Sequence, residues 1–264
     1  MADNYIESIE ANVGGTKQDV PVRDAEAVHV FGNAGSHNSI YRGNNLGSSV
    51  TQEQWNAIEA GIFDDLYIGD YWVIGGVNWR IAAFDYYYNV GDTAFTKHHC
   101  VIVPDTALYN VQMNDTNTTA GGYVGSQMYT NGLEQAKNTI NSAFGSSHVL
   151  SHRILLTNAV SSGYPSAGAW VYSTVDLMCE QMVYGGAIFM PMANGTITPY
   201  NYRAEKSQLP LFRHDNSKIG IRSSWWLRDV VTATFFASVY SNGDARYDYA
   251  SNFYGVRPAF CIGI

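Results

Sequence analysis

Apolar side chains recur at helical spacing in three segments of the chain, namely 52–62, 133–144 and 170–182. In the first segment, Trp55, Ile58 and Ile62 fall on one helical face, and Ser49 stands ahead of them as the expected N-cap. The spacing predicts three short amphipathic helices. Each is expected to bury its apolar face against a core.

Strand patterns occupy much of the remaining chain. Two β-rich runs flank a Gly-Gly turn within residues 71–84, which predicts a hairpin. A further strand is expected at 99–103, and the polar residues 106–129 predict a long loop. From Trp225 onward the pattern is strand-like, and the apolar run 256–264 predicts a buried final strand.

Composition agrees with a mixed α+β fold. Of the 264 residues, 14% are charged and 14% aromatic, which is typical of a strand-and-loop protein rather than a helical bundle. Residues 1–35 are more polar than the rest, and we interpret them as an N-terminal attachment or oligomerisation segment. Residues 36–264 then form the main domain, which is long enough to bury a substantial core.

The charge pattern narrows the possible partners. The net charge of -8 includes no run of like charges, so it favours solubility and argues against a nucleic-acid partner. No stretch approaches 18 apolar residues, and the N-terminus lacks a signal-peptide pattern. We therefore expect neither membrane insertion nor export by the general secretory route.

Metal chemistry has little support in the sequence. His148 and His152 are four residues apart, but no Glu and no third ligand stand at a metal-binding spacing. The cysteines are odd in number and widely spaced, which is typical of buried core residues: Cys100, Cys179 and Cys261. We expect no metal and no cofactor.

Catalytic motifs are equally scarce. Asp176 and Glu180 lie four apart on the expected third helix, where like charges usually mark a solvated face. The chain has no Gly-x-Ser-x-Gly elbow and no phosphate-binding glycine loop. We expect no catalytic residue and interpret the protein as a non-enzyme.

A tyrosine-rich segment stands out near the C-terminus. Within residues 238–254, 11 of the 17 residues are Tyr, Ser, Asn or Asp, which is the composition of binding loops. Every residue from 232 to 255 can be encoded by a codon ending in C, so Lys, Glu, Gln, Met and Trp are absent. The alternative is an ordinary half-buried strand, because Ala237 and Val239 alternate with polar neighbours. The two interpretations are compatible if the polar neighbours point outward.

Two motifs flank this segment: Ser-Trp-Trp-Leu-Arg-Asp at 224–229 and Gly-Val-Arg-Pro-Ala-Phe at 255–260. With them the chain resembles the variable proteins of diversity-generating retroelements, especially those of gut bacteriophages. The hairpin region 69–81 is also similar to that family. The resemblance implies a C-type-lectin-like α+β domain over residues 36–264, with a variable region at about 223–254 in which adenine-directed mutagenesis changes selected codons.

The resemblance also implies roles for individual residues. The large apolar and cationic residues of the flanking motifs would form the scaffold: Trp225, Trp226, Leu227, Arg228, Arg257 and Pro258. The changeable, ligand-binding residues would be Ser223, Ser224, Thr232, Thr234, Phe235, Ser238, Tyr240, Ser241, Asp244, Arg246, Tyr247, Asp248, Tyr249, Phe253 and Tyr254. The Glu-Pro-Asn, Gln-Pro-Asp and Trp-Asn-Asp signatures of calcium-dependent sugar-binding lectins do not occur, which argues against a calcium site and against a monosaccharide ligand.

Together these features predict a hypervariable receptor-binding protein in the virion of a phage, at the tail tip. Its partners would be a bacterial cell-surface protein or glycan, other virion proteins and further copies of itself, with a trimer as one arrangement. The expected binding residues should face solvent on one shared face. Two alternatives remain open: a virion-associated enzyme, either a glycan hydrolase or a formylglycine-generating-like oxidase, and a purely structural virion component.

Overall fold

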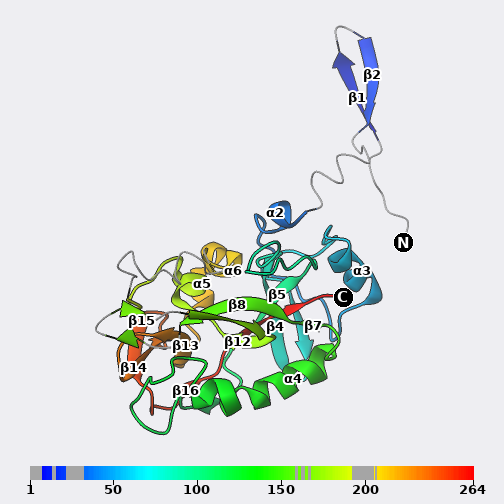
Figure 1. The fold of residues 1–264 in the computed structure, drawn as a ribbon. Coiled ribbons are helices and arrows are strands. Elements are labelled where there is room, and N and C mark those ends of the chain that lie inside the picture. The colour runs from blue at the N-terminus through cyan, green and yellow to red at the C-terminus, as the bar shows by residue number, and fades with distance from the viewer. Residues whose placement is uncertain are drawn as a thin grey trace.

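A computed structural model describes residues 8–13, 16–21, 33–157, 160–161, 164–165, 168–191, 205 and 207–264. Two antiparallel-rich sheets and a few short helices form the body, which is therefore α+β as expected (Figure 1). None of the described helices is long and apolar enough to cross a bilayer.

The first sheet has six strands. Its order is β12 (Val175–Leu177), β17 (Pro258–Ile262), β5 (Cys100–Pro104), β4 (Val77–Phe84) and β3 (Tyr71–Ile74), and β7 (Val149–Leu150) also pairs with β17. The predicted hairpin is confirmed, because Gly75 and Gly76 take positive φ angles of 61° and 78° between β3 and β4. All five residues of β17 are buried, which confirms the predicted final strand.

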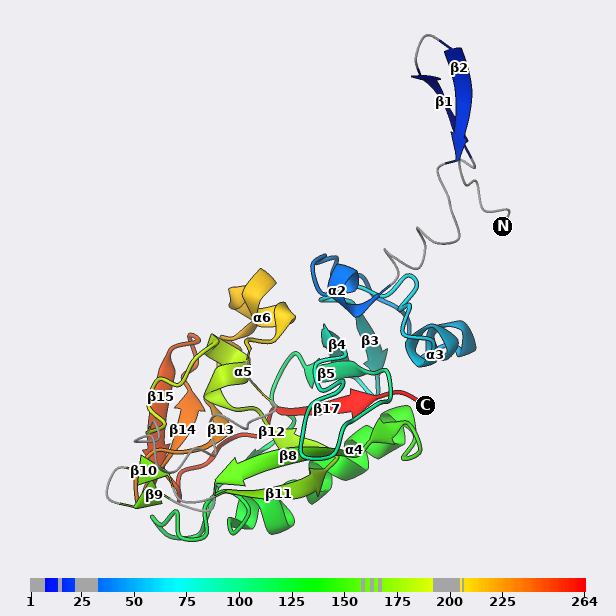
Figure 2. The same ribbon diagram turned by 45° about the horizontal axis from the view of Figure 1, so that its top comes forward.

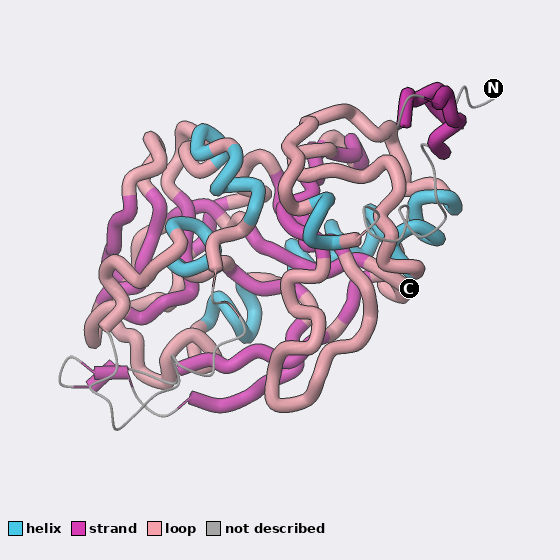
Figure 3. The backbone as a smooth tube through the Cα atoms, turned by 90° about the horizontal axis from the view of Figure 1, so that it is seen from above, coloured by secondary structure: helices cyan, strands magenta, loops and turns pink. Residues whose placement is uncertain are grey.

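The second sheet lies at one end of the body. Its order is β15 (Ala245–Tyr249), β14 (Phe235–Val239), β13 (Trp225–Val230), β16 (Tyr254–Gly255) and β6 (Asn110–Val111). The pairing of β16 with β6 places a strand inside the predicted loop 106–129. This sheet lies at the end of the body away from the N-terminal hairpin (Figure 3).

Three further strand pairs occur among the described residues. They are β8 (His152–Thr157) with β11 (Gly168–Ser173), β9 (Val160–Ser161) with β10 (Tyr164–Pro165), and β1 (Ser8–Val13) with β2 (Thr16–Pro21). The last pair falls in the predicted N-terminal segment and pairs with no other described strand. A lone two-stranded hairpin is at best marginally stable in water.

The helices are short. They are α2 (Ala34–His37), α3 (Gln52–Glu59), α4 (Glu134–Phe144), α5 (Glu180–Tyr184) and α6 (Pro210–His214), with a π-helical turn at Met128–Gly132 and a 3-10 turn at Asn216–Lys218. Helix α4 lies along one side of the sheets, and α5 and α6 lie on the other (Figures 1 and 2). The first two predicted helices are confirmed as α3 and α4.

Two of the helix predictions need correction. The N-cap of α3 is Thr51 rather than Ser49, because Thr51 and Gln54 form a reciprocal capping box. The predicted helix 170–182 is wrong: β11 and β12 occupy most of it, and α5 begins only at Glu180. Pairing with β8 and β17 decides the conformation there, since long-range strand pairing overrides a short helical pattern.

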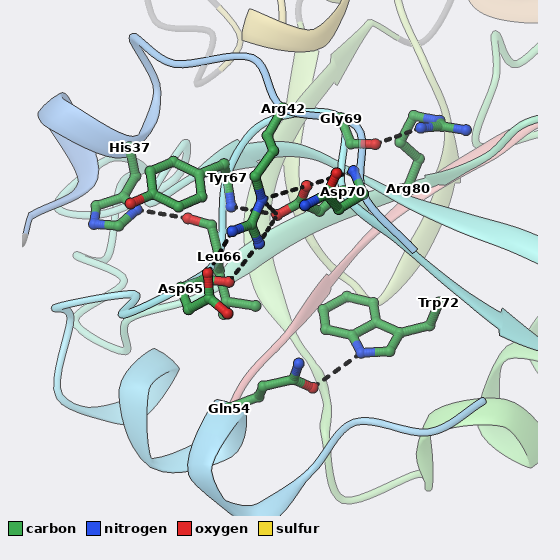
Figure 4. A network of polar contacts seen from close by, with 11 residues as sticks. His37, Arg42, Gln54, Asp65, Leu66, Tyr67, Gly69, Asp70, Trp72 and Arg80 are labelled. Atoms are coloured by element: carbon green, nitrogen blue, oxygen red, sulfur yellow. Dashed lines mark hydrogen bonds and ion pairs between the residues drawn. The ribbon is translucent and has the colours of Figure 1, made fainter. Parts of the chain in front are cut away.

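A buried polar network fixes the chain ahead of the first sheet (Figure 4). The carboxylate of Asp70 is fully buried and accepts two N–H bonds from Arg42, at 3.1 Å from Nε and 2.7 Å from Nη2. It also accepts the backbone N–H groups of Asn44 and Tyr67 at 2.8 and 2.9 Å. The Arg42 guanidinium lies over the Tyr67 ring at 4.6 Å. This network therefore attaches the segment around residues 42–44 to the start of β3.

Candidate binding surface

The predicted scaffold residues are all buried, as expected. On β13, Trp225 donates its indole N–H to the carbonyl of Ile219 at 3.2 Å, and Trp226 donates to the carbonyl of Val111 at 2.9 Å. A β-bulge interrupts the pairing of β13 with β14 between Trp226 and Val230. The two indoles therefore fix the second sheet to the loop 219–224 on one side and to β6 on the other.

Two buried guanidinium groups connect the second sheet to the rest of the body. Arg257 donates to the carbonyls of Pro104 and Lys218 at 2.9 and 2.8 Å, and burial lowers its pKa to about 10. Arg228 forms an ion pair with Glu205 at 2.8 Å. Burial alone would lower the pKa of Arg228, but the Glu205 carboxylate raises it well above its usual value. Both arginines are structural, which agrees with their expected scaffold role.

One face of β15 carries a polar and aromatic group of side chains, here called the Asp248 cluster: Tyr240, Arg246, Asp248, Asn252 and Tyr254. Asp248 accepts bonds from the amide of Asn252, at 2.6 Å, and from the hydroxyl of Tyr254. The guanidinium of Arg246 lies 5.3 Å from the ring centre of Tyr240. Burial and the bond to Asp248 raise the pKa of Tyr254 to about 12.

The opposite face of β15 carries an aromatic group, here called the Phe235 cluster: Phe189, Phe235, Tyr247 and Tyr249. The ring centre of Phe235 lies 5.1 Å from the ring centre of Tyr247 and 4.6 Å from that of Tyr249. Directly paired residues of antiparallel strands share a face, and Phe235 pairs with Tyr249 while Phe236 pairs with Asp248. The expectation of one shared face is therefore wrong, because successive residues of a strand point to opposite sides.

Ser238 is a second correction. Its exposed fraction is 1%, and its neighbours Ala237 and Val239 are fully buried, so the expected polar-out alternation of β14 is absent. Strand β14 lies between β13 and β15, and Ser238 pairs with both Trp226 and Arg246. It is covered on both sides and takes no part in an exposed surface.

The remaining predicted binding residues lie in the connections at the ends of the strands. Ser241 and Asp244 belong to the turn between β14 and β15, where Arg222 donates its N–H to the Ser241 carbonyl at 2.9 Å. Thr232 and Thr234 form the turn before β14 and are at least partly exposed. Ser223 and Ser224 precede β13, and Phe253 in the last turn is 65% exposed.

Sequence reasoning missed the contribution of the polar loop to this surface. Thr119 donates its hydroxyl to the carbonyl of Thr232 at 2.6 Å, and Ser251 donates its hydroxyl to Asn117 at 2.7 Å. The N–H groups of residues 113 and 114 bond to the carbonyl of Ala250 at 2.9 Å. The loop thus supports both the turn before β14 and the last turn of the chain. The length of this loop in the sequence was the available signal.

Comparison with known proteins adds one match. Residues 192–264 match the family model described as "Domain of unknown function (DUF6273)". The matched range includes β13 to β17, hence both flanking motifs and the tyrosine-rich segment. No curated protein and no solved structure matches the chain.

The two carboxylates considered for catalysis are buried and accept hydrogen bonds within the protein. Asp176 is buried in β12 and accepts the hydroxyl of Tyr123 at 3.1 Å, and burial raises its pKa to about 7. Glu180 is also buried, and its carboxylate accepts backbone N–H groups of residues 188–190 at 2.9 to 3.1 Å. The cavity beside Asp176 measures only about 10 Å³. That volume suits one water molecule rather than a substrate.

His148 and His152 pack against aromatic rings, and the cysteines are buried. His148 stacks on Trp55 with ring centres 4.1 Å apart, whereas His152 lies 4.0 Å from the Tyr87 ring. Burial lowers the pKa of His99 and of His152 to about 4. The three cysteines are buried and form no disulfide, as expected. Within the described ranges, no group of three or more His, Cys, Asp or Glu side chains is arranged to hold a metal ion.

Proposed function

We propose that this chain is a recognition protein that binds its partner at β15, the edge strand of the second sheet among the described strands. The binding surface comprises the exposed side chains of the Asp248 and Phe235 clusters, on both faces of the edge strand β15. One observation carries the proposal: Tyr240, Tyr247 and Tyr249 are each 45–46% exposed beside a framework of fully buried tryptophans. Exposed tyrosines on a rigid support are typical of binding surfaces, because little side-chain entropy is lost on contact.

The two-faced arrangement sets the shape of the partner. A flat partner docking on one face of β15 would contact only one cluster, since residues 246 and 248 point away from residues 247 and 249. A partner that wraps the edge strand contacts both clusters. We therefore propose a concave or flexible receptor site that encloses the edge.

We further propose that the scaffold is C-type-lectin-like and that a diversity-generating retroelement varies the surface. The division of burial supports this proposal, because the expected scaffold residues are buried while 14 of the 15 expected variable residues are exposed or partly exposed, Ser238 excepted. Sequencing the gene across a population tests it. Substitutions should gather at those 14 positions, at first and second codon bases, and evenly spread silent changes would contradict it.

The proposed setting is a phage tail tip, and the proposed partner is a protein or glycan on a bacterial surface. The hairpin β1–β2, which is too small to be stable alone, would provide attachment to other virion proteins or to further copies of the chain. Several linked copies would convert weak single-site binding into stable adhesion. Chromatography of the whole chain with light scattering measures the expected homo-oligomer.

Whole-cell binding tests the recognition surface directly. The labelled full chain is added to a panel of intact gut bacteria, and the double variant Tyr247→Ala/Tyr249→Ala should bind the recognised strain at least tenfold more weakly. The matched control is Tyr172→Ala, since Tyr172 is 65% exposed but lies on β11, where it stacks on Arg153. Equal loss in both variants would contradict a role for the β15 edge.

A further inference from the structure

Beside the Asp248 cluster, a groove runs between the last turn of the chain and the polar loop. Its volume is about 410 Å³, within the roughly 300–1,000 Å³ range of small-ligand sites. The exposed ring of Phe253 forms one wall, and Gln112, Asp115 and Gln127 contribute polar groups. Val111 and Tyr254 are directly paired and so share the face of the sheet that carries Asp248. The groove therefore adjoins the proposed recognition surface.

The polar groups of the groove hold one another in place. Gln112 and Gln127 donate their amide N–H groups to opposite oxygens of the Asp115 carboxylate, at 2.7 and 2.5 Å. The backbone N–H of Gln127 bonds to the side-chain oxygen of the buried Asn114 at 2.9 Å. An amide has two N–H donors and a carbonyl acceptor, so these bonds leave further donors and acceptors for a ligand. These bonds between exposed side chains orient the three polar groups toward one another.

The chemistry of the lining selects the class of ligand. A carboxylate and several amides suit hydroxyl groups, which both donate and accept hydrogen bonds. The lining contains one carboxylate and no cationic side chain, which disfavours phosphate and other anions. An exposed aromatic ring suits a flat, apolar C–H face. A neutral pyranose ring combines an apolar face with a rim of hydroxyls.

We infer that this groove binds a neutral sugar unit of a surface glycan without a metal ion, with the C–H face of the sugar on Phe253 and its hydroxyls on Asp115, Gln112 and Gln127. The inference rests on the proposed recognition function and names the glycan as the receptor class. Asp115 is the only acidic residue of the lining, whereas a calcium ion needs several oxygen ligands. Sugar binding in this groove is therefore expected to be independent of calcium.

A second groove of about 490 Å³ provides the internal comparison. It is lined by Ile74, Gly75, Asn138, Thr139, Ser142 and Ala143, and so has neither an aromatic ring nor a charge. A similar volume without those groups should not bind sugars. Thr139→Ala in this second groove is therefore the matched control for changes in the first.

The experiment measures binding of the full chain to immobilised neutral oligosaccharides of glucose, galactose, mannose and N-acetylglucosamine, in parallel with and without a chelator. At least one sugar should bind, Phe253→Ala should weaken its binding at least tenfold, and Asp115→Ala should also weaken it. Phe253→Tyr and Thr139→Ala should bind like the natural chain. Circular dichroism of each variant shows that the fold is kept.

Each of the following results would overturn the inference, and whole-cell binding shows whether the proposed function fails as well. If no sugar binds while the chain still binds cells through Tyr247 and Tyr249, the groove is not a sugar site and the recognition function stands. If sugar binding is equally reduced by Thr139→Ala, or disappears with the chelator, the assignment to this metal-free groove is wrong. If neither cells nor sugars bind, both proposals fail.

Discussion

Two aspartates, Asp70 and Asp248, each stand at the centre of a polar cluster, but the clusters differ in what surrounds them. Asp70 is fully buried and accepts hydrogen bonds from the Arg42 guanidinium and from two backbone N–H groups. Asp248 lies on an edge strand, partly exposed, and accepts side-chain groups from Asn252 and Tyr254. The first cluster uses its hydrogen-bonding capacity to fix the chain. The second holds exposed side chains in position, where a partner can reach them.

The largest expected effect concerns Asp70. Asp70→Ala leaves two backbone N–H groups without their acceptor in a buried site and removes one of the two carboxylate partners of Arg42, which keeps Asp65. The free energy of unfolding should fall by about 3–5 kcal/mol. Urea denaturation of the variant and the natural chain measures the difference. A loss below about 1 kcal/mol would mean that this network does not hold the segment before β3.

The next effect concerns His152, a titratable side chain that is buried in the interior, unlike the partly exposed Asp248. Burial lowers its pKa from 6.5 to about 4. Between these values the unfolded chain binds a proton that the folded chain does not, so the stability present above pH 6.5 is lost as the pH falls toward 4. Replacing the ring by Phe removes this dependence.

His152→Phe should therefore recover about 2 kcal/mol of stability relative to the natural chain at pH 5, beyond any difference at pH 8. Urea midpoints of both proteins at the two pH values measure this recovery. The comparison at pH 8 is the control, because it contains only the change in packing. An equal difference at both pH values would show that His152 does not contribute to acid sensitivity.

The smallest expected effect on stability is that of Asp248→Ala. Its partners Asn252 and Tyr254 remain accessible to water, so the free energy of unfolding should change by about 1 kcal/mol or less. Cell binding should nevertheless weaken, because Tyr254 and Asn252 lose the group that positions them. A stability loss as large as that of Asp70→Ala would remove the distinction between the two clusters.

Much of the fold follows from local pattern. The hairpin of β3 and β4 forms where Gly-Gly permits positive φ angles, and α4 forms where apolar residues repeat at helical spacing. The scaffold role of Trp225, Trp226 and Arg257 was implied by the family resemblance, and all three residues are fully buried. For the hairpin and for α4, the deciding interactions lie within a few residues of one another.

The binding surface was predictable only in part. Its residues lie near the predicted segment, but the pairing partners decide their orientation. Ser238 lies on the central strand β14, between Trp226 and Arg246, and is buried, and Tyr247 and Asp248 point to opposite faces because successive residues of a strand alternate. The support from Thr119 and Asn117 comes from more than 110 residues away along the chain.

The sequence by itself determined the hairpin of β3 and β4, the helices α3 and α4, the buried final strand and the position of the tyrosine-rich segment. Only the tertiary structure decided that residues 170–177 are strands, that Ser238 is covered, and that the exposed side chains divide between two faces of one edge strand. The physical reason is that helical and strand periodicity are local properties, whereas strand neighbours and the groups they cover depend on contacts between distant parts of the chain.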